Sequence, residues 1–289
     1  MPSANGHTLT IGDITVVGAS DGRVAFDPRM LFPKTPLSVW EKYHDRFPEY
    51  FKGDSFFNNL GSFLIRSGEE SVLCDTGFGP HGNMLGSPAP GLLLDDLKAK
   101  GASLEEVDSV FLTHLHGDHV GWNLGEDEEA AVGWKPTFPN ARYMVHEADW
   151  AWFTQPEQLE ASRRASAERT YLPLEDLGVL HLMDGETELA PGVTAFPTPG
   201  HTPGHMSVLI ASNNERAMII GDIAGSPMQL TETDWFYLPD WDQAMGRDAR
   251  YRILDMAEQD DMVVMGSHLS PPGWGVIVRW EGKRYWQGL

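Results

Sequence analysis

The chain of 289 residues is 41% hydrophobic and 22% charged, a balance typical of globular proteins that bury a large core. No stretch approaches the roughly 20 apolar residues of a membrane helix, the N-terminus lacks an export signal, and a single cysteine excludes an internal disulfide, so we expect a cytoplasmic protein. The formal net charge of −21, from 21 Lys and Arg against 42 Asp and Glu, disfavours nucleic acid and membranes as partners and favours an uncharged or cationic small-molecule substrate.

Short β-rich segments separated by turn residues open the chain. Residues 7–19 and 62–77 are predicted to contain strands. Residues 92–107 predict an amphipathic helix with a glycine stop and a fresh "SLEE" capping box. Residues 108–114, "DSVFLTH", then read as a buried strand that ends at a histidine.

The second half repeats this order. Strands are predicted within residues 179–201, 206–212 and 216–223, followed by a helix over 241–259 and a strand over 261–268. Each half therefore runs from strands into a helix and on to one more strand. That order predicts an α+β fold, an αββα sandwich of two sheets packed face to face with helices outside. No repeat or linker divides the chain, so we expect a single domain over residues 1–289.

Two segments stand outside this pattern. An N-terminal extension over about 20–57 contains an aromatic- and proline-rich stretch at 28–57, and a helical insertion over about 147–172 begins with exposed aromatic residues. Both segments would be explained equally well by an extra packing layer. The alternative is a lid, a pocket wall or the contact surface of a homodimer, because large apolar side chains outside the core pattern often mark contacts.

The stretch "FLTHLHGDHVGWN" (111–123) is dense in potential metal ligands. His114 ends the predicted strand, His116 follows two residues later, and a turn at Gly117 brings Asp118 and His119 back toward the same place. Further ligand-type residues follow later apolar strands, namely His201, Asp222 and His268. A single histidine or aspartate at a turn is better explained as an ordinary structural residue. Seven of them at strand-to-loop junctions predict a shared metal site.

These motifs carry a family resemblance. "DTGFGP", "THLHGDH", "TPGHTPGH", "GD" and a late "GSH" resemble the metallo-β-lactamase fold superfamily, in the right order over roughly residues 55–270. The resemblance implies a two-metal site at one edge of the sandwich. It assigns metal one to His114, His116 and His201, metal two to Asp118, His119 and His268, and the bridging position to Asp222. It also implies that Asp75 supports the ligands from behind.

The donor types agree with hydrolytic chemistry. Imidazole and carboxylate ligands suit zinc, and also iron, cobalt or manganese, so we expect two divalent ions, with zinc favoured. Two such ions, roughly 3.5–4 Å apart, can share a water and activate it near neutral pH. Asp118 and Asp222 are then the groups that handle the proton, which makes them the expected catalytic residues. His205 is expected to brace the loop after His201, not to bind metal.

Within the superfamily, the chain most resembles the branch of lactonases and methyl-parathion-hydrolase-like enzymes. The expected substrate is an uncharged ester, lactone or phosphotriester. The alternatives are an iron-dependent redox or sulfur-handling enzyme, similar to persulfide dioxygenases, a glyoxalase II-like thioesterase, and a binding protein that lost catalysis. The complete ligand set disfavours the last. Quorum-quenching lactonases often carry a tyrosine three residues after the bridging aspartate. Here that position is Gly225, which predicts a roomier pocket.

Aromatic residues near the motifs are candidates for the pocket wall, because small-molecule sites are mostly apolar. With ten tryptophans in the chain, some of these side chains are expected in the core instead. The candidate pocket residues are Phe56, Phe57, Phe78, His81, Trp122, Trp150, Trp152, Gly225 and Trp274.

Overall fold

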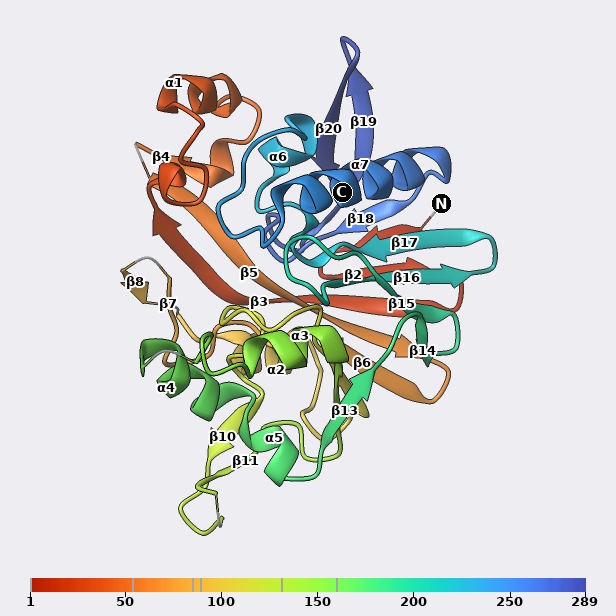
Figure 1. Cartoon of the computed structure of the whole chain (residues 1–289). Coiled ribbons are helices and arrows are strands. Elements are labelled where there is room, and N and C mark those ends of the chain that lie inside the picture. The colour runs from red at the N-terminus through yellow and green to blue at the C-terminus, as the bar shows by residue number, and fades with distance from the viewer. Residues whose placement is uncertain (1, 54, 85, 89, 131, 160) are drawn as a thin grey trace.

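Two β-sheets packed face to face form the centre of the protein (Figure 1). The computed structural model describes residues 2–53, 55–84, 86–88, 90–130, 132–159 and 161–289. The first sheet has the order β1-β2-β3-β5-β6-β9-β12-β13, and β4 pairs with β5. Its strands are β1 (Ser3–Asn5), β2 (Thr8–Ile11), β3 (Ile14–Phe26), β4 (Phe51–Lys52), β5 (Ser55–Ser67), β6 (Glu70–Cys74), β9 (Ser109–Phe111), β12 (Arg142–His146) and β13 (Leu180–Met183).

The second sheet follows chain order from β14 to β20. Neighbouring strands run antiparallel except for β17 and β18, which are parallel. Its strands are β14 (Thr187–Ala190), β15 (Val193–Pro197), β16 (Met206–Ser212), β17 (Glu215–Ile219), β18 (Val263–Met265), β19 (Trp274–Trp280) and β20 (Lys283–Gly288). In the first sheet, β6, β9, β12 and β13 also run parallel. The carboxyl ends of β6, β9, β17 and β18 lead into the loops that carry the motifs, whereas β12 leads into α3.

Helices cover the outer face of each sheet, which confirms the predicted αββα arrangement. In Figure 1, α6 and α7 lie toward the top and α2 to α5 toward the bottom, with most of the two sheets between them. Two small hairpins, β7–β8 and β10–β11, lie outside the sheets. The remaining elements are η1 (Pro28–Met30), α1 (Leu37–Trp40), η2 (Glu41–Tyr43), η3 (Pro48–Tyr50), β7 (Asn83–Met84), β8 (Ser87–Pro88), α2 (Leu93–Ala99), β10 (Leu124–Glu126), β11 (Trp134–Pro136), α3 (Glu147–Phe153), α4 (Ala161–Thr170), α5 (Pro173–Asp176), η4 (Gly221–Ile223), α6 (Pro227–Thr231) and α7 (Gln243–Gln259).

The central core lies between the sheets. Phe63 and Phe111 of the first sheet meet Val208 and Ile219 of the second, and all four side chains are buried. Trp274, at the start of β19, belongs to this cluster and is fully buried. The sequence placed Trp274 near the site because His268 is close by in the chain. That expectation is wrong, because the strand register points its indole between the sheets.

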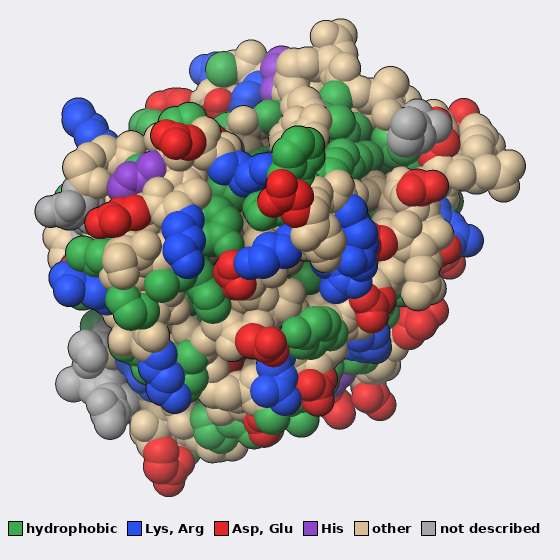
Figure 2. All heavy atoms as spheres, turned by 90° about the horizontal axis from the view of Figure 1, so that it is seen from above, with side chains coloured by type: hydrophobic (Ala, Val, Ile, Leu, Met, Phe, Trp, Pro, Cys, Tyr) green, Lys and Arg blue, Asp and Glu red, His purple; other side chains and the backbone are tan. Residues whose placement is uncertain are grey.

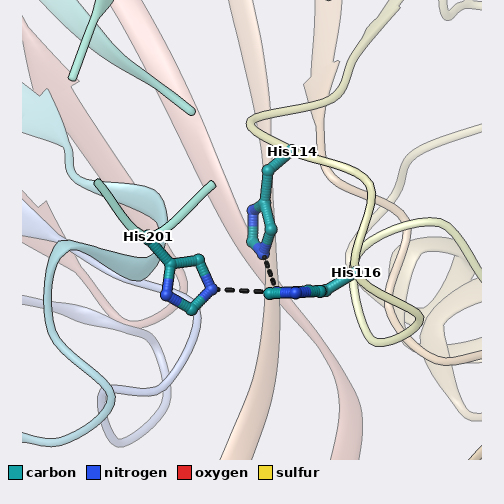
Figure 3. Close-up of side chains that lie close together, drawn as sticks. All are labelled: His114, His116 and His201. Atoms are coloured by element: carbon teal, nitrogen blue, oxygen red, sulfur yellow. Dashed lines mark hydrogen bonds between the residues drawn. The ribbon is translucent and has the colours of Figure 1, made fainter. Parts of the chain in front are cut away.

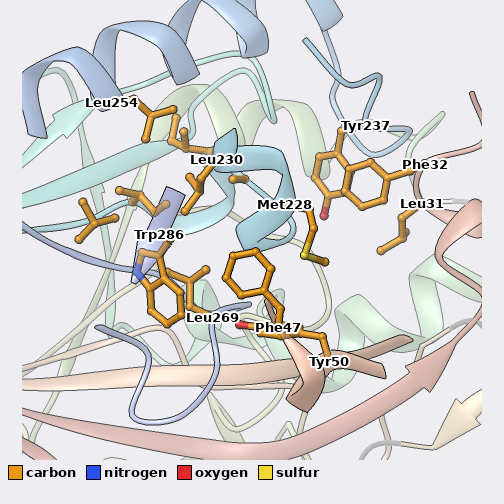
Figure 4. Packing of buried hydrophobic residues seen from close by; sticks show 14 of the residues in the cluster. Leu31, Phe32, Phe47, Tyr50, Met228, Leu230, Tyr237, Leu254, Leu269 and Trp286 are labelled. Atoms are coloured by element: carbon orange, nitrogen blue, oxygen red, sulfur yellow. The ribbon is translucent and has the colours of Figure 1, made fainter. Parts of the chain in front are cut away.

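The aromatic residues of the N-terminal extension pack on the outer face of the second sheet (Figure 4). Phe32, Trp40 and Tyr50 are buried in one cluster with side chains of α6 and α7, and the rings of Phe32 and Trp40 lie 5.2 Å apart. Phe56 lies in the same cluster, with its ring centroid 5.4 Å from that of Trp40, so it is a core residue and not a pocket residue. The extension therefore contributes a packing layer through these side chains.

Charged side chains of both signs alternate on the face seen in Figure 2. The basic side chains of the β19–β20 hairpin form ion pairs with acidic residues beside it. Arg279 and Arg284 contact Glu258 of α7, and Lys283 contacts Glu232. Among the described residues, no helix is long and apolar enough to cross a bilayer.

Candidate metal site

Asp75 anchors the first motif loop. Directly after β6, it adopts a positive φ of 61°, a conformation that Asp tolerates better than most residues. Its carboxylate accepts from the Thr113 amide (2.8 Å) and from the Thr113 hydroxyl, and its Oδ2 lies 2.8 Å from Nδ1 of His119. One buried carboxylate thereby connects the end of β6 to both sides of the 114–119 turn.

Three histidines converge from two distant loops (Figure 3). Nδ1 of His116 lies 3.1 Å from Nε2 of His114 and 2.9 Å from Nε2 of His201. We call these residues the three-histidine group. Burial, aided by neighbouring histidines, holds the pKa of His114 and of His116 well below the ordinary value, so both imidazoles are neutral. Neutral imidazole is the form that ligates a metal.

A second cluster lies beside the first. Asp118, His119 and His268 form this mixed group, with their donor atoms close together. Asp222 stands between the two groups. Its Oδ1 is 3.2 Å from Nε2 of His119, and its Oδ2 is 3.2 Å from Nε2 of His268 and 3.3 Å from Nε2 of His201. The geometry brings together every residue predicted as a ligand.

The cluster is complementary to cations. Nε2 of His119 and Oδ1 of Asp222 are buried and face each other at 3.2 Å, but neither atom makes a well-directed hydrogen bond within the described structure. Burial opposes ionisation of Asp222, yet His268 and His119 hold its pKa well below the ordinary range. Burying charged and polar atoms without partners is costly, and divalent ions would satisfy both the carboxylates and the free imidazole nitrogens. The donor set therefore fits two metal ions.

Hydrogen bonds orient the ligand imidazoles from behind. Nδ1 of His119 faces Asp75, Nδ1 of His201 lies 3.0 Å from Oδ1 of Asp240, and Nδ1 of His268 donates to the Asn59 carbonyl (2.9 Å). Each contact occupies Nδ1 and leaves Nε2 directed at the cluster. Support of this kind fixes the tautomer of a ligating histidine.

His205 braces the backbone of Asp222. The Asp222 amide donates to Nε2 of His205 (2.9 Å), and Nδ1 of His205 donates to the Thr198 carbonyl (3.1 Å). Burial lowers the pKa of His205 to about 3, so its Nε2 remains an acceptor. Gly221 is required here, because it has a φ of 52° and a Cβ would lie 2.6 Å from that nitrogen.

Two cavities flank the 116–118 turn. The larger cavity, of about 320 Å³, has His116 and His201 in its wall together with Trp152, Trp241 and Arg163. The smaller cavity, of about 250 Å³, is lined by Phe78, His81, Trp122 and Arg169 among others. Gly117, Ser166 and Thr170 belong to both walls, so α4 covers the place where the cavities adjoin. The larger cavity contains predicted ligands in its wall, whereas the smaller one reaches the turn only at Gly117.

The remaining pocket candidates lie elsewhere. Trp150 packs against Tyr171 (ring centroids 6.0 Å apart) in the core beneath the helices. Phe57 lies under the Arg23 guanidinium, 5.4 Å from its ring centroid. The space beside Gly225 is not open, because a Cβ there would lie 2.5–2.6 Å from the phenol end of Tyr237. The expected roomier pocket is therefore filled by a side chain from a later loop.

Several residues that support the site lie outside the sequence motifs and were not predicted. Tyr237 stacks on His201 with ring centroids 5.5 Å apart. Asp240 contacts His201 and pairs with Arg250. Asp21 accepts from the Phe78 and Gly79 amides and from the Trp122 indole, each at 2.8 Å. Only burial and partner geometry identify these residues.

Comparisons with known proteins agree with this geometry. The model of the Metallo-beta-lactamase superfamily matches residues 62–268. An N-acyl homoserine lactonase of Bacillus sp is 26% identical over 173 residues, which cover 55% of this chain and 60% of that protein. The chain spans 55–60% of the length of the first curated relatives it matches.

Two solved structures share the fold over nearly the whole chain. The dizinc quorum-quenching lactonase AidC, in complex with a product, has a TM-score of 0.82 at 22% identity and covers 98% of this chain and 96% of its own. The hydrolase AbOPH in the beta lactamase superfamily has a TM-score of 0.82 at 24% identity, with coverage of 99% and 98%.

Proposed function

The chain belongs to the metallo-beta-lactamase superfamily, and from this membership and the site geometry we propose that it is a dinuclear metal-dependent hydrolase of uncharged esters or lactones. The observation that carries the proposal is the position of Asp222. Its carboxylate lies within 3.3 Å of His201 from the three-histidine group and of His119 and His268 from the mixed group, so one side chain could contact ions held by both groups. The three-histidine group would hold one ion and the mixed group the other.

When bound, two divalent ions would lower the pKa of a shared water and polarise the substrate carbonyl. The protein supplies the rest of the chemistry. Asp118 is the most exposed carboxylate of the cluster, with its side chain 10% exposed, and Oδ2 lies 3.5 Å from Nε2 of His268. This placement lets Asp118 accept a proton at the cluster and pass it to solvent or to the leaving group.

Tyr237 supplies a hydroxyl beside the three-histidine group. Burial, with Asp222 and Asp118, raises the pKa of Tyr237 well above its ordinary value, so the phenol keeps its proton. A protonated phenol can donate a hydrogen bond to a substrate oxygen that gains negative charge. In this proposal, Tyr237 serves from the 233–240 loop in the space next to Gly225.

The cavities favour a substrate with an apolar arm. Trp152, Phe153 and Trp241 give the larger cavity an aromatic wall, while Arg163 and Gln158 add polar groups. Acyl chains and aryl groups match such a wall, and the polar groups could bind an amide or ester oxygen. An ester or lactone with an acyl or aryl substituent is therefore the proposed substrate class.

Metal analysis combined with a substrate panel tests the proposal. Purified protein should hold about two zinc-like ions per chain and should hydrolyse members of a panel of lactones, aryl esters, phosphotriesters and β-lactams. An Asp222→Ala variant should lose turnover and metal together, whereas Asp95→Ala, an exposed control on α2, should keep both. One iron per chain with oxygen consumption would instead support the redox alternative and would overturn the hydrolase.

A further inference from the structure

A buried ion pair lies directly behind the three-histidine group. Asp240 and Arg250 are each about 1% exposed at the side chain, and Nη2 of Arg250 lies 3.2 Å from Oδ2 of Asp240. We propose that this pair is a positioning unit that sets the metal affinity of the three-histidine group through His201. The inference rests on the proposed function, since it assumes that the cluster binds metal.

Asp240 determines which nitrogen of His201 faces the cluster. Oδ1 of Asp240 lies 3.0 Å from Nδ1 of His201, while Nε2 of His201 lies 2.9 Å from His116 and 3.3 Å from Asp222. A carboxylate at Nδ1 accepts its proton and leaves the Nε2 lone pair free. Carboxylates placed behind a ligating histidine fix its ring and raise its basicity.

Arg250 holds Asp240 and the neighbouring loops in register. Its guanidinium donates to the Ile223 carbonyl (2.6 Å), to the Thr233 carbonyl (3.0 Å) and to Asp240. Ile223 is the residue after Asp222, so one cation links the bridging carboxylate's turn to the carboxylate behind His201. The position of Arg250 therefore affects both the turn that carries Asp222 and the carboxylate that contacts His201.

Close backbone packing leaves Asp240 little freedom. The Trp241 amide donates to the His201 carbonyl and the Asp242 amide to the Gly200 carbonyl, each at 2.9 Å. A Cβ at Gly246 would lie 2.9 Å from Oδ2 of Asp240. Backbone pairing thus fixes the spacing between His201 and Asp240, and the start of α7 packs against the carboxylate.

Stability alone does not explain such a pair. Replacing a buried ion pair with well-packed apolar residues is often neutral or stabilising, because desolvation offsets the attraction. Asp149 offers a comparison within the same molecule. It is also fully buried, but it accepts from the Leu115 and Gly204 amides and from the Thr202 hydroxyl, with no histidine among these partners. Asp149 is therefore the matched control for a buried carboxylate that supports the ligand loops without contacting a ligand imidazole.

Zinc affinity and the His201 tautomer test the proposal. In chelator competition, Asp240→Asn should bind the ion of the three-histidine group about 10- to 100-fold more weakly, the range typical for loss of such support. Long-range ¹H–¹⁵N spectra of the metal-free protein should show His201 protonated at Nδ1 in the native chain and as a tautomer mixture in the variant. Asp149→Asn should lower the melting temperature and leave both readouts unchanged.

The proposal is overturned if Asp240→Asn binds zinc with native affinity and keeps the native His201 tautomer. Should Asp240→Asn fail to fold, Arg250→Lys serves instead, because it keeps the charge but loses the fork that reaches Ile223 and Thr233. Arg250→Lys should weaken zinc binding several-fold, and native affinity would overturn the proposal. If the native protein binds two zinc ions but hydrolyses no member of the substrate panel, only the proposed function is refuted. The zinc affinity and the His201 tautomer can still be compared between the native protein and its variants.

Discussion

Gly225→Ala should destabilise the protein through a clash with Tyr237. The added Cβ would lie 2.5 Å from Cζ, 2.6 Å from Cε2 and 2.6 Å from Oη of Tyr237. Ordinary carbon contacts are about 3.5–4.0 Å, so the ring must move by about 1 Å. Tyr237 has little room to do so, because it stacks on His201 and on Phe32, with centroids 5.5 Å and 5.0 Å away. Figure 4 shows Tyr237 beside Phe32 within the packed cluster.

Overpacking of this kind costs about 1–3 kcal/mol, which exceeds the roughly 0.4–1 kcal/mol gained when Gly is replaced by Ala in the unfolded chain. Gly225 has no positive φ, so backbone strain adds nothing to the expected cost. A loss of 1–3 kcal/mol corresponds to a fall of roughly 2–5 °C in melting temperature for a protein of this size.

Thermal and urea unfolding of four variants measures the effect. Gly125→Ala is the matched control, because it also lacks a positive φ and its nearest contact would be Thr137 Oγ1 at 3.9 Å. Its stability should stay within about 0.5 kcal/mol of the native value. In a Tyr237→Ala background the cost of Gly225→Ala should vanish, a coupling that a double-mutant cycle detects. A native-like Gly225→Ala protein, or an equal cost without the ring, would refute the reasoning.

Three further predictions follow from the site and the core. Tyr237→Phe should lower kcat by roughly 10²–10³-fold with metal content unchanged, as measured by steady-state kinetics and metal analysis, and undiminished kcat would remove the phenol from the mechanism. Cys74 is buried, which together with Asp75 raises the pKa of its thiol well above the ordinary value, so Ellman's reagent should detect one thiol only after denaturation and none rapidly in native protein. Chelation should lower the melting temperature and zinc should restore it, since an ion at 100 times its Kd contributes about 2.7 kcal/mol, and an unchanged melting temperature would argue against resident ions.

The ligand cluster was predictable because its residues follow apolar strands. β9, β17 and β18 end at Phe111, Ile219 and Met265, and each leads within a few residues to a predicted ligand. A short buried strand is visible in sequence as an apolar run, and its end marks the sheet edge. The order of sheets and helices followed from the same signals.

Element boundaries were less predictable. The helix expected over 92–107 is α2, which ends at Ala99, and Gly101 follows with a φ of 78°. Ser103 and Glu106 do form the reciprocal hydrogen bonds of a capping box, at 3.2 Å each, yet no helix follows them before β9. A local cap is too weak to propagate a helix where the chain must turn into a buried strand.

Contacts made only by tertiary packing could not be predicted from a sequence pattern. Tyr237 and Asp240 lie in a loop with no regular period, and Arg250 lies on a helix where a buried cation contradicts the usual pattern. Phe56 and Trp274 show the converse error, because proximity in sequence to a motif says nothing about which face of a strand a side chain takes. The cavity walls therefore required the structure, whereas the predicted ligand set could be named from the sequence alone.

The proposed ligands divide between the two sheets, and this division has a consequence for how the protein matures. Each proposed ion position combines side chains from the loops of the first sheet with side chains from those of the second, the last of them being His268. Neither half of the chain alone can capture an ion with its full set of donors. A nascent chain emerging from the ribosome would thus acquire tight sites only when its two halves have docked. With the proposed ligands, metal uptake would be a late event that reports correct assembly of the sandwich.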